Sequence, residues 1–247
     1  MKKNFDTVII GSGYTALGYV AARPNTLIIE ERELADASFG APLRTHMLSD
    51  YTPKSEECRA LIERYRELGI LRDGQLNAPA LECGFADHAI RNGVRIYLKT
   101  RVISTEANDS SYTLRTVSNS GITKIEAGRI LDLRPKGRRE LTFLFTASDD
   151  RVLDDTRALF PEGWTEPAFY RGRYALHMPI HEDGELRDVK RYVYDRWQRG
   201  KWDAMLLYTA PYGAVISSDT HNPTDATAQN PFEAFDLGLS LGREVAK

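Results

Sequence analysis

Two glycines and a small residue stand at the spacing G-x-G-x-x-A near the start of the chain, in a run of six residues: Gly11, Ser12, Gly13, Tyr14, Thr15 and Ala16. In this spacing the first glycine permits a tight turn, the second lets the backbone approach a pyrophosphate, and the small sixth residue lets a helix pack closely on a strand. The free N–H groups and the dipole at the start of the following helix attract phosphate groups. The motif therefore predicts a dinucleotide bound through its phosphates.

The elements expected around this motif are those that such a site needs. A β-branched strand is predicted at 5–10, a short helix at 14–22 and a second strand at 26–30, which together form a compact βαβ unit with parallel, buried strands. The second strand ends at Glu30 and is followed by Glu31, where an acidic residue binds the hydroxyls of the adenosine ribose. These carboxylates disfavour the ribose 2′-phosphate, so NADP is not expected in this site.

The rest of the chain has a part that continues this α/β pattern and a part that does not. Apolar spacing and turn signals predict helices at 53–68, 79–91, about 188–199 and 231–245, a strand at 94–98 and a three-stranded meander over 101–132. Aromatic residues are concentrated between 160 and 212, where the alternation of strand and helix stops. The chain after Pro135 is therefore expected to form a separate, mostly antiparallel layer.

Together, these features resemble the FAD-dependent oxidoreductases of the glutathione-reductase-like superfamily. Besides the glycine motif, three stretches are similar to parts of those proteins: 92–102, 122–133 and 230–238. The resemblance implies backbone contacts to the adenine at Val102 and a strand that returns from the meander to the parallel sheet. It also implies a last helix, beginning at Asn230, whose N-terminus faces the pyrimidine ring of the flavin and whose dipole stabilises negative charge there.

The same resemblance implies the fold class and the activity. The fold would be α/β, a Rossmann-like FAD/NAD(P)-binding fold with a parallel sheet and β-meander, built from residues 1–134 and 208–247. The segment 135–207 would be a small aromatic-rich α+β cap domain on the substrate side. The implied activity is that of an oxidoreductase that transfers a hydride between a small organic substrate and FAD, with the protein supplying orientation and electrostatics.

Two departures from that family keep other functions open. The returning strand ends in Leu133, Arg134 and Pro135 in place of a small Ala-x-Gly group, and neither Asp219 nor Asp225 follows a glycine, as the family's Gly-Asp pair would require. Because NAD shares its ADP half with FAD, an NAD-binding enzyme that uses the same site is one alternative. A flavoprotein-like binding or regulatory subunit without catalysis is the other.

Four residues are candidates for a catalytic role: Arg44, His46, His177 and His221. Arg44 and His46 follow the ribose-binding strand, in a loop that the family lays along the FAD, where they could stabilise an anion or move a proton. His177 is a candidate acid or base on the substrate side, and His221 precedes the final helix. A metal site is not expected, because Pro179 separates His177 from His181 in a strand-like segment.

The composition limits the partners and the compartment. The 247 residues carry 33 Lys+Arg against 35 Asp+Glu, a net charge of −2, which gives no broad electrostatic surface for nucleic acid or an anionic membrane. Only two cysteines, Cys58 and Cys83, are present, as is typical of a cytoplasmic globular protein. A small-molecule substrate is the expected partner, and the aromatic segment also allows contact with a second copy of the chain in a homo-oligomer.

Overall fold

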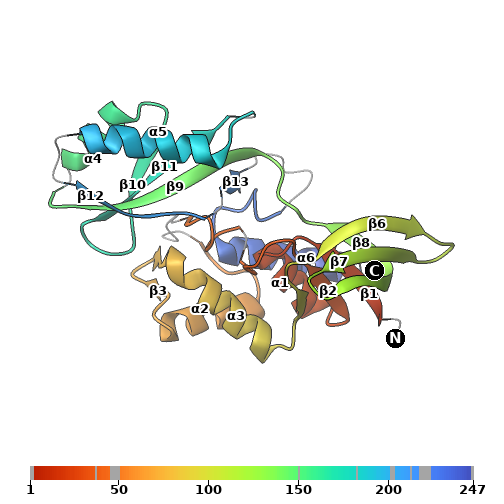
Figure 1. Cartoon of the computed structure of the whole chain (residues 1–247). Coiled ribbons are helices and arrows are strands. Elements are labelled where there is room, and N and C mark those ends of the chain that lie inside the picture. Colours follow the sequence, from red (N-terminus) through yellow and green to blue (C-terminus); the bar gives the residue numbers. More distant parts are fainter. Residues whose placement is uncertain are drawn as a thin grey trace.

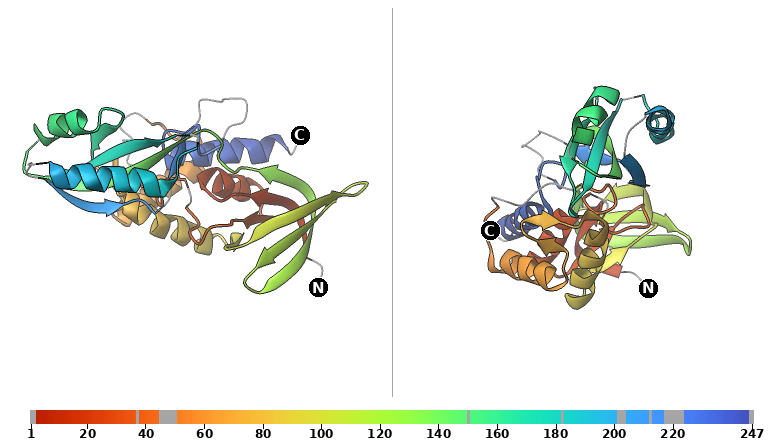
Figure 2. Two further views of the ribbon diagram at one scale, coloured as in Figure 1. Left: turned by 45° about the horizontal axis from the view of Figure 1, so that its top comes forward. Right: turned by 90° about the vertical axis from the view of Figure 1, so that its left-hand side faces the viewer.

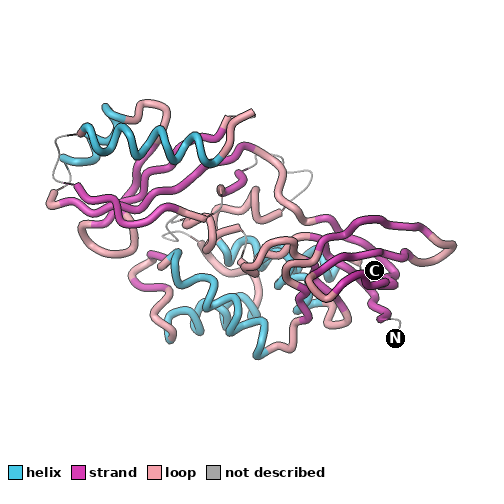
Figure 3. The backbone as a smooth tube through the Cα atoms, in the orientation of Figure 1, coloured by secondary structure: helices cyan, strands magenta, loops and turns pink. Residues whose placement is uncertain are grey.

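The computed structural model describes residues 3–36, 38–44, 51–149, 151–181, 183–200, 204–211, 213–216 and 224–245. These residues form two lobes, one built on a six-stranded sheet and the other on a five-stranded sheet (Figure 1). The long strand β9 (Arg138–Ala147) follows the last strand of the first sheet and carries the chain into the second lobe. Figure 2 shows the same two lobes from two further directions, and Figure 3 shows that helices accompany strands in both.

The sheet of the first lobe is mixed, with its parallel part in the middle and at one edge. Its strands, in spatial order, are β5 (Arg95–Tyr97), β2 (Thr26–Ile29), β1 (Lys3–Ile10), β8 (Gly121–Asp132), β7 (Tyr112–Ser118) and β6 (Arg101–Ala107). β1 pairs in parallel with both β2 and β8, and β2 pairs in parallel with β5. β6, β7 and β8 pair antiparallel in sequence order. The predicted βαβ unit, the meander and the returning strand are confirmed.

Helices α1 (Tyr14–Ala22) and α6 (Pro231–Glu244) pack closely, so the two ends of the chain meet in the first lobe (Figure 1). Glycines make this contact possible. A Cβ atom on Gly18 would lie 1.9 Å from a carbonyl oxygen of α6, and one on Gly238 would lie 1.9 Å from a carbonyl oxygen of α1. Each glycine therefore faces the backbone of the other helix, and both predicted helices are confirmed.

The segment between β2 and β5 adds helices α2 (Glu56–Glu67) and α3 (Leu81–Arg91), joined by the short strands β3 (Leu71–Arg72) and β4 (Gln75–Leu76) and a 3₁₀ turn (Ala78–Ala80). Ser55 caps α2 by accepting a hydrogen bond from the N–H of Cys58. Apolar residues of both helices, such as Tyr65 and Phe85, pack around the buried ring of Tyr14. The two helices were predicted, whereas the hairpin β3–β4 was not.

The second lobe is an antiparallel sheet backed by two helices. Its elements are β9, α4 (Arg151–Leu159), β10 (Trp164–Pro167), β11 (Arg173–Ile180), α5 (Leu186–Arg199), β12 (Ala204–Thr209) and β13 (Ala214–Ile216). The strand order is β10-β11-β9-β12, with β13 also paired to β9. The ring of Phe145 contacts Tyr174 and Trp197, so aromatic residues form much of the core between sheet and helices. The antiparallel layer and α5 are confirmed, and α4 is an addition.

Two negative findings hold for the described ranges. No helix there is long and apolar enough to cross a membrane. No group of three or more His, Cys, Asp or Glu side chains there could hold a metal ion.

Candidate nucleotide-binding site

The G-x-G-x-x-A motif forms the turn between β1 and α1. The N–H of Gly11 donates to the carbonyl oxygen of Ile29 at the end of β2, with an N···O distance of 2.9 Å. Gly11 has a φ of 98°, a backbone conformation that favours glycine. Gly13 is the N-cap of α1 and has no side chain to accept hydrogen bonds from the first turn of the helix. The turn therefore presents backbone donors at the carboxyl ends of the parallel strands.

Glu30, directly after β2, is buried beside this turn. Its Oε2 accepts hydrogen bonds from the N–H and the hydroxyl of Ser12, at 2.9 and 3.0 Å. Its Oε1 accepts from the N–H and the Nε of Arg32, at 2.9 and 3.0 Å. Burial raises the pKa of Glu30, but the charge of Arg32 and these donors outweigh burial and hold the pKa below its ordinary value. Glu30 is therefore an ionised acceptor next to the glycine turn.

Asp225 binds the N-terminus of α1. Its Oδ2 accepts from the N–H of Tyr14 at 2.8 Å, and its Oδ1 accepts from the N–H of Thr15 at 2.7 Å. A Cβ atom on Gly13 would lie 2.2 Å from Oδ2, so the carboxylate fills the space that this glycine leaves open. Burial raises the pKa of Asp225, although the Thr15 and Tyr14 donors and the charge of Arg44 act in the opposite direction. The carboxylate thus takes two donors that the motif offers to a phosphate.

Arg44, a predicted catalytic candidate, holds the chain around Asp225 in place. Its Nη1 donates to the carbonyl oxygen of Asp225 at 2.9 Å, and its Nη2 donates to that of Ala228 at 2.8 Å. The guanidinium lies over the ring of Phe39, 4.3 Å from its centroid. Burial lowers the pKa of Arg44 to about 10, against the charges of Asp225 and Asp36, so Arg44 is a cation at neutral pH. It anchors residues 224–228, which we call the Asp225 turn.

The loop between β2 and Arg44 is fixed by two carboxylates. Glu82 of α3 accepts hydrogen bonds from the N–H groups of Ala35 and Asp36, at 2.9 and 2.7 Å. Asp36 accepts from the N–H groups of Phe39 and Gly40, at 3.0 and 2.6 Å. Burial is the largest cause that raises the pKa of Asp36 to about 7, and the negative charges of Asp225 and Glu82 raise it further. The hydrogen bonds from Phe39 and Gly40 act in the opposite direction and lower this pKa. An aspartate shortly before a glycine is a turn signal that could have identified Asp36 from the sequence.

The end of β8 lies against the other side of the glycine turn. A Cβ atom on Gly11 would lie 2.9 Å from the backbone nitrogen of Arg134, so the two backbones are in close contact. The N–H of Leu133 donates to the carbonyl oxygen of Ile10 at 2.9 Å, and the guanidinium of Arg134 binds both carboxylate oxygens of Asp132. The backbone of Leu133 and Arg134 thus makes the close contact with the glycine turn. This contact does not require small side chains at the end of the returning strand.

The other predicted cofactor-binding residues lie further from the turn. Glu31 is exposed and has its Oε1 3.8 Å from Nε of Arg101. Val102 is half-buried in β6 at a break in the pairing with β7. Asn230 caps α6 by accepting hydrogen bonds from the N–H groups of Phe232 and Glu233. The predicted residues His46, Asp219 and His221 lie outside the described residues.

His177 belongs to a hydrogen-bonded cluster in the second lobe. Its Nδ1 and the hydroxyl of Thr142 are 3.1 Å apart, its Nε2 lies 3.0 Å from Oε1 of Glu166, and its ring stacks on Trp164 with a centroid separation of 3.9 Å. His177 is buried, and it alternates along β11 with the residues that face α5. The cluster therefore lies on the face of the second sheet that is turned away from its helices.

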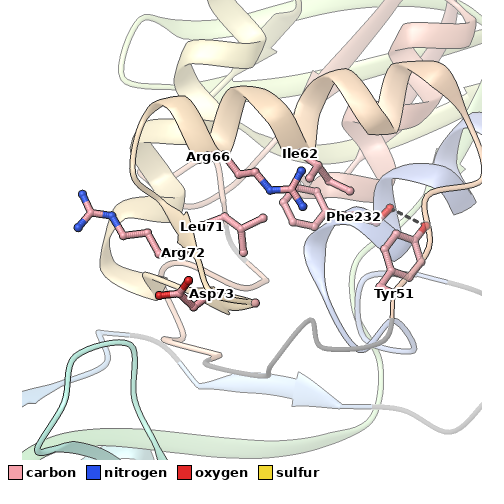
Figure 4. A pocket seen from close by; sticks show the side chains of 8 residues that line it. Tyr51, Ile62, Arg66, Leu71, Arg72, Asp73 and Phe232 are labelled. Carbon is pink, nitrogen blue, oxygen red and sulfur yellow. Dashed lines mark hydrogen bonds between the residues drawn. The ribbon is translucent and has the colours of Figure 1, made fainter.

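Two of the cavities that border these elements have apolar walls. One, of about 430 Å³, lies between the loop after β2 and strands of the second lobe, with Leu34, Ala41 and Leu43 on one side and Leu144 and Leu207 on the other. The other, of about 580 Å³, lies beside the first turn of α6. Figure 4 shows Phe232, Ile62 and Leu71 in its wall, with Arg66 next to Ile62 and with Arg72 and Asp73 at the end away from Tyr51. The Oη of Tyr51 lies 3.3 Å from the carbonyl oxygen of Phe232.

Solved structures of similar fold cover nearly the whole chain, although the sequence matches no known family profile and no curated protein. A p-nitrophenol 4-monooxygenase from Pseudomonas putida matches with a TM-score of 0.58 at 14% identity, over 100% of this chain and 79% of that one. An L-proline dehydrogenase from P. horikoshii matches with a TM-score of 0.59 at 10% identity, over 99% and 94%. Aklavinone-11 hydroxylase, in a ternary complex with FAD and aklavinone, matches with a TM-score of 0.53 at 14% identity, over 100% and 62%.

Identities this low show the fold alone. The chain has the Rossmann-like FAD/NAD(P)-binding fold found in flavin-dependent oxidoreductases. The predicted fold class is confirmed.

Proposed function

We propose that the chain is an FAD-binding oxidoreductase of the glutathione-reductase-like superfamily, which transfers a hydride between a small organic substrate and the flavin. The observation that carries this proposal is the unit of β1, glycine turn, α1 and β2, with Glu30 bonded to Ser12 at the carboxyl edge of the parallel sheet. That edge is where open α/β sheets bind their ligands.

The residues at this edge fit the ADP half of FAD. Glu30 would hold the ribose, and the N–H groups of Tyr14 and Thr15 would hold the pyrophosphate once Asp225 has moved from them. One buried polar atom nearby, Arg44 Nε, has no hydrogen-bond partner among the described residues. Such an atom favours a site that a polar ligand completes, because buried polar groups are rarely left unpaired.

In this proposal residues 1–134 and 208–247 bind the cofactor, apart from the residues of β12 and β13, which pair with β9 in the second sheet. Val102 would lie beside the adenine, and the first turn of α6, capped by Asn230, would face the pyrimidine ring. When bound, FAD supplies the hydride acceptor or donor. The dipole at the start of α6 would stabilise negative charge at that ring.

The segment 135–207 would act as the cap on the substrate side. The cavity between the lobes, about 430 Å³, falls in the range of small-molecule sites, and most of the side chains around it are apolar. His177 can hold a proton at Nε2, towards Glu166, or at Nδ1, towards Thr142. In this proposal His177 and Glu166 together move a proton to or from the substrate.

The position of Asp225 supports a second candidate function. A carboxylate on the phosphate-binding donors favours a flavoprotein-like binding or regulatory subunit that no longer binds FAD. An NAD-binding enzyme that uses the same ADP site remains a third candidate, since the glycine turn and Glu30 serve either dinucleotide.

The test is a titration of the purified protein with FAD, NAD and ADP, followed by absorbance, calorimetry and thermal unfolding. FAD is expected to bind with the lowest Kd and to raise the unfolding temperature. Glu30→Gln should weaken all three ligands about tenfold, whereas Glu33→Gln, an exposed neighbour paired with Lys99, should not. Colourless protein that takes up no added FAD would refute the proposal, and tighter binding of NAD than of FAD would favour the NAD enzyme.

A further inference from the structure

The donors at the start of α1 are already satisfied inside the chain. Gly13, the N-cap, supplies no acceptor, yet the N–H groups of Tyr14 and Thr15 each bond to a different oxygen of Asp225. A carboxylate that receives two neighbouring N–H groups at a positive helix end makes the contacts that a phosphate makes there.

The space for a phosphate is filled as well. The pyrophosphate is expected to approach over Gly13. A Cβ atom placed on Gly13 would lie only 2.2 Å from Oδ2 of Asp225 and 3.1 Å from Oγ of Ser38, so these side chains already fill that space. A phosphate and the carboxylate cannot occupy this space together. Binding of a dinucleotide through its pyrophosphate therefore requires the side chain of Asp225 to leave.

The Asp225 turn is built to keep the carboxylate where it is. Arg44 binds the carbonyl oxygens at both ends of the segment from Asp225 to Ala228. Within the turn, the N–H of Ala226 donates to Thr224 Oγ1, and the N–H of Thr227 donates to the carbonyl oxygen of Thr224. Two residues further on, Asn230 starts α6, which packs tightly against α1. The turn is thus tied at both sides, and its carboxylate points at the end of α1.

From these contacts we propose that Asp225 is an internal competitor for the pyrophosphate site: the ligand-free chain closes its own site with this carboxylate, and a dinucleotide binds only by displacing it. The inference rests on the proposed function, in that it concerns the same site. Its consequence is an apparent affinity lower than the donors alone would give, by the fraction of molecules in which Asp225 has left.

The experiment measures two quantities on wild-type protein, Asp225→Asn and Asp225→Ser: the unfolding temperature without ligand, and the Kd for ADP and for FAD by calorimetry. Removing the competitor should lower the unfolding temperature of the ligand-free protein, because the Tyr14 and Thr15 donors lose a charged acceptor. It should also tighten ADP binding about tenfold, which corresponds to about 1.4 kcal/mol. Asp225→Ser has a single, shorter side-chain oxygen and leaves more of the space over Gly13 open, in case the amide of Asp225→Asn, which has the same shape as the carboxylate, still fills it.

Asp236→Asn is the matched control. Asp236 is also a buried aspartate, and it accepts hydrogen bonds from Tyr51, the N–H of Lys54 and Ser55, away from the glycine turn. Its substitution should lower the unfolding temperature and leave the Kd for ADP unchanged. This control separates general destabilisation from the opening of the site.

Each outcome supports or refutes the inference and the proposed function separately. If the Asp225 variants bind ADP no tighter, or more weakly, than wild type does, Asp225 supports the site and the inference is wrong, even where FAD binding by wild type upholds the proposed function. If the variants bind ADP more tightly than wild type does, while wild type binds no FAD, the inference holds and the proposed function fails. If no protein binds either ligand, both fail.

Discussion

Replacing Gly238 by alanine tests the contact that joins the two ends of the chain. The new methyl group would lie 1.9 Å from the carbonyl oxygen of Thr15. Heavy atoms in contact stand about 3.5 Å apart, so the helices must separate locally by about 1.5 Å. Overpacking of this kind costs about 1–3 kcal/mol, and the upper end applies because the opposing atom belongs to the backbone of α1. Alanine gains about 1 kcal/mol of helix propensity over glycine, which leaves a net loss of about 2 kcal/mol.

The assay is urea-induced unfolding followed by circular dichroism and tryptophan fluorescence. Gly238→Ala should lower the midpoint urea concentration and leave the m-value unchanged. Ser240→Ala, an exposed substitution in the same helix, should change the free energy of unfolding by no more than about 0.5 kcal/mol. Gly18→Ala should cost a similar amount, and the double variant less than the sum, since the first methyl group already separates the helices. A Gly238→Ala protein as stable as wild type would refute the contact.

Three further predictions concern the polar groups of the site and the second lobe. In the folded protein the pKa of Asp36, about 7, lies above its ordinary value, so between about pH 4 and pH 7 the folded protein keeps a proton that the unfolded chain has released. The free energy of unfolding should therefore fall as the pH rises from about 4 to about 7. Asp36→Asn should reduce this dependence on pH, as measured by urea unfolding. Thr142→Val removes the hydroxyl partner of His177 Nδ1 and should cost about 1 kcal/mol in the same assay, with no change in the Kd for ADP. Arg44→Met leaves two carbonyl oxygens of the Asp225 turn without their donor; it should cost about 2–3 kcal/mol, and a cost below about 0.5 kcal/mol would contradict the anchoring role.

The glycine turn and its acidic partner could be predicted from the sequence because both lie within one βαβ unit. Gly11, Gly13 and Glu30 belong to elements that pair directly, so their spacing along the chain fixes their spacing in the structure. The same holds for α1 and α6, whose ends carry local signals such as Asn230 before a proline. What the sequence did not indicate was α4, in which only Val152 and Thr156 are buried, too few for a clear helical period.

The contacts that decide how the site behaves join distant parts of the chain. Asp225 reaches Tyr14 across 211 residues, and Arg44 reaches Ala228 across 184. Nothing in the residues around Asp225 indicates a partner, and its lack of a preceding glycine pointed only to a departure from a family pattern. These contacts depend on the tertiary packing of α6 on α1, which period and spacing do not specify.

The predicted phosphate site and the unpredicted contact of Asp225 with it have the same physical origin. A helix whose N-cap is glycine leaves its first N–H groups unpaired, and this is what makes the motif a phosphate site. Buried donors need an acceptor in the ligand-free protein as well, so a carboxylate on a neighbouring turn is stabilised by the same field that attracts phosphate. In this chain the close packing at Gly18 and Gly238 holds the start of α6, and with it Asp225, within hydrogen-bond distance of α1. A glycine motif thus shows that donors are offered, and the affinity for a dinucleotide depends on how strongly the chain's own acceptors hold them.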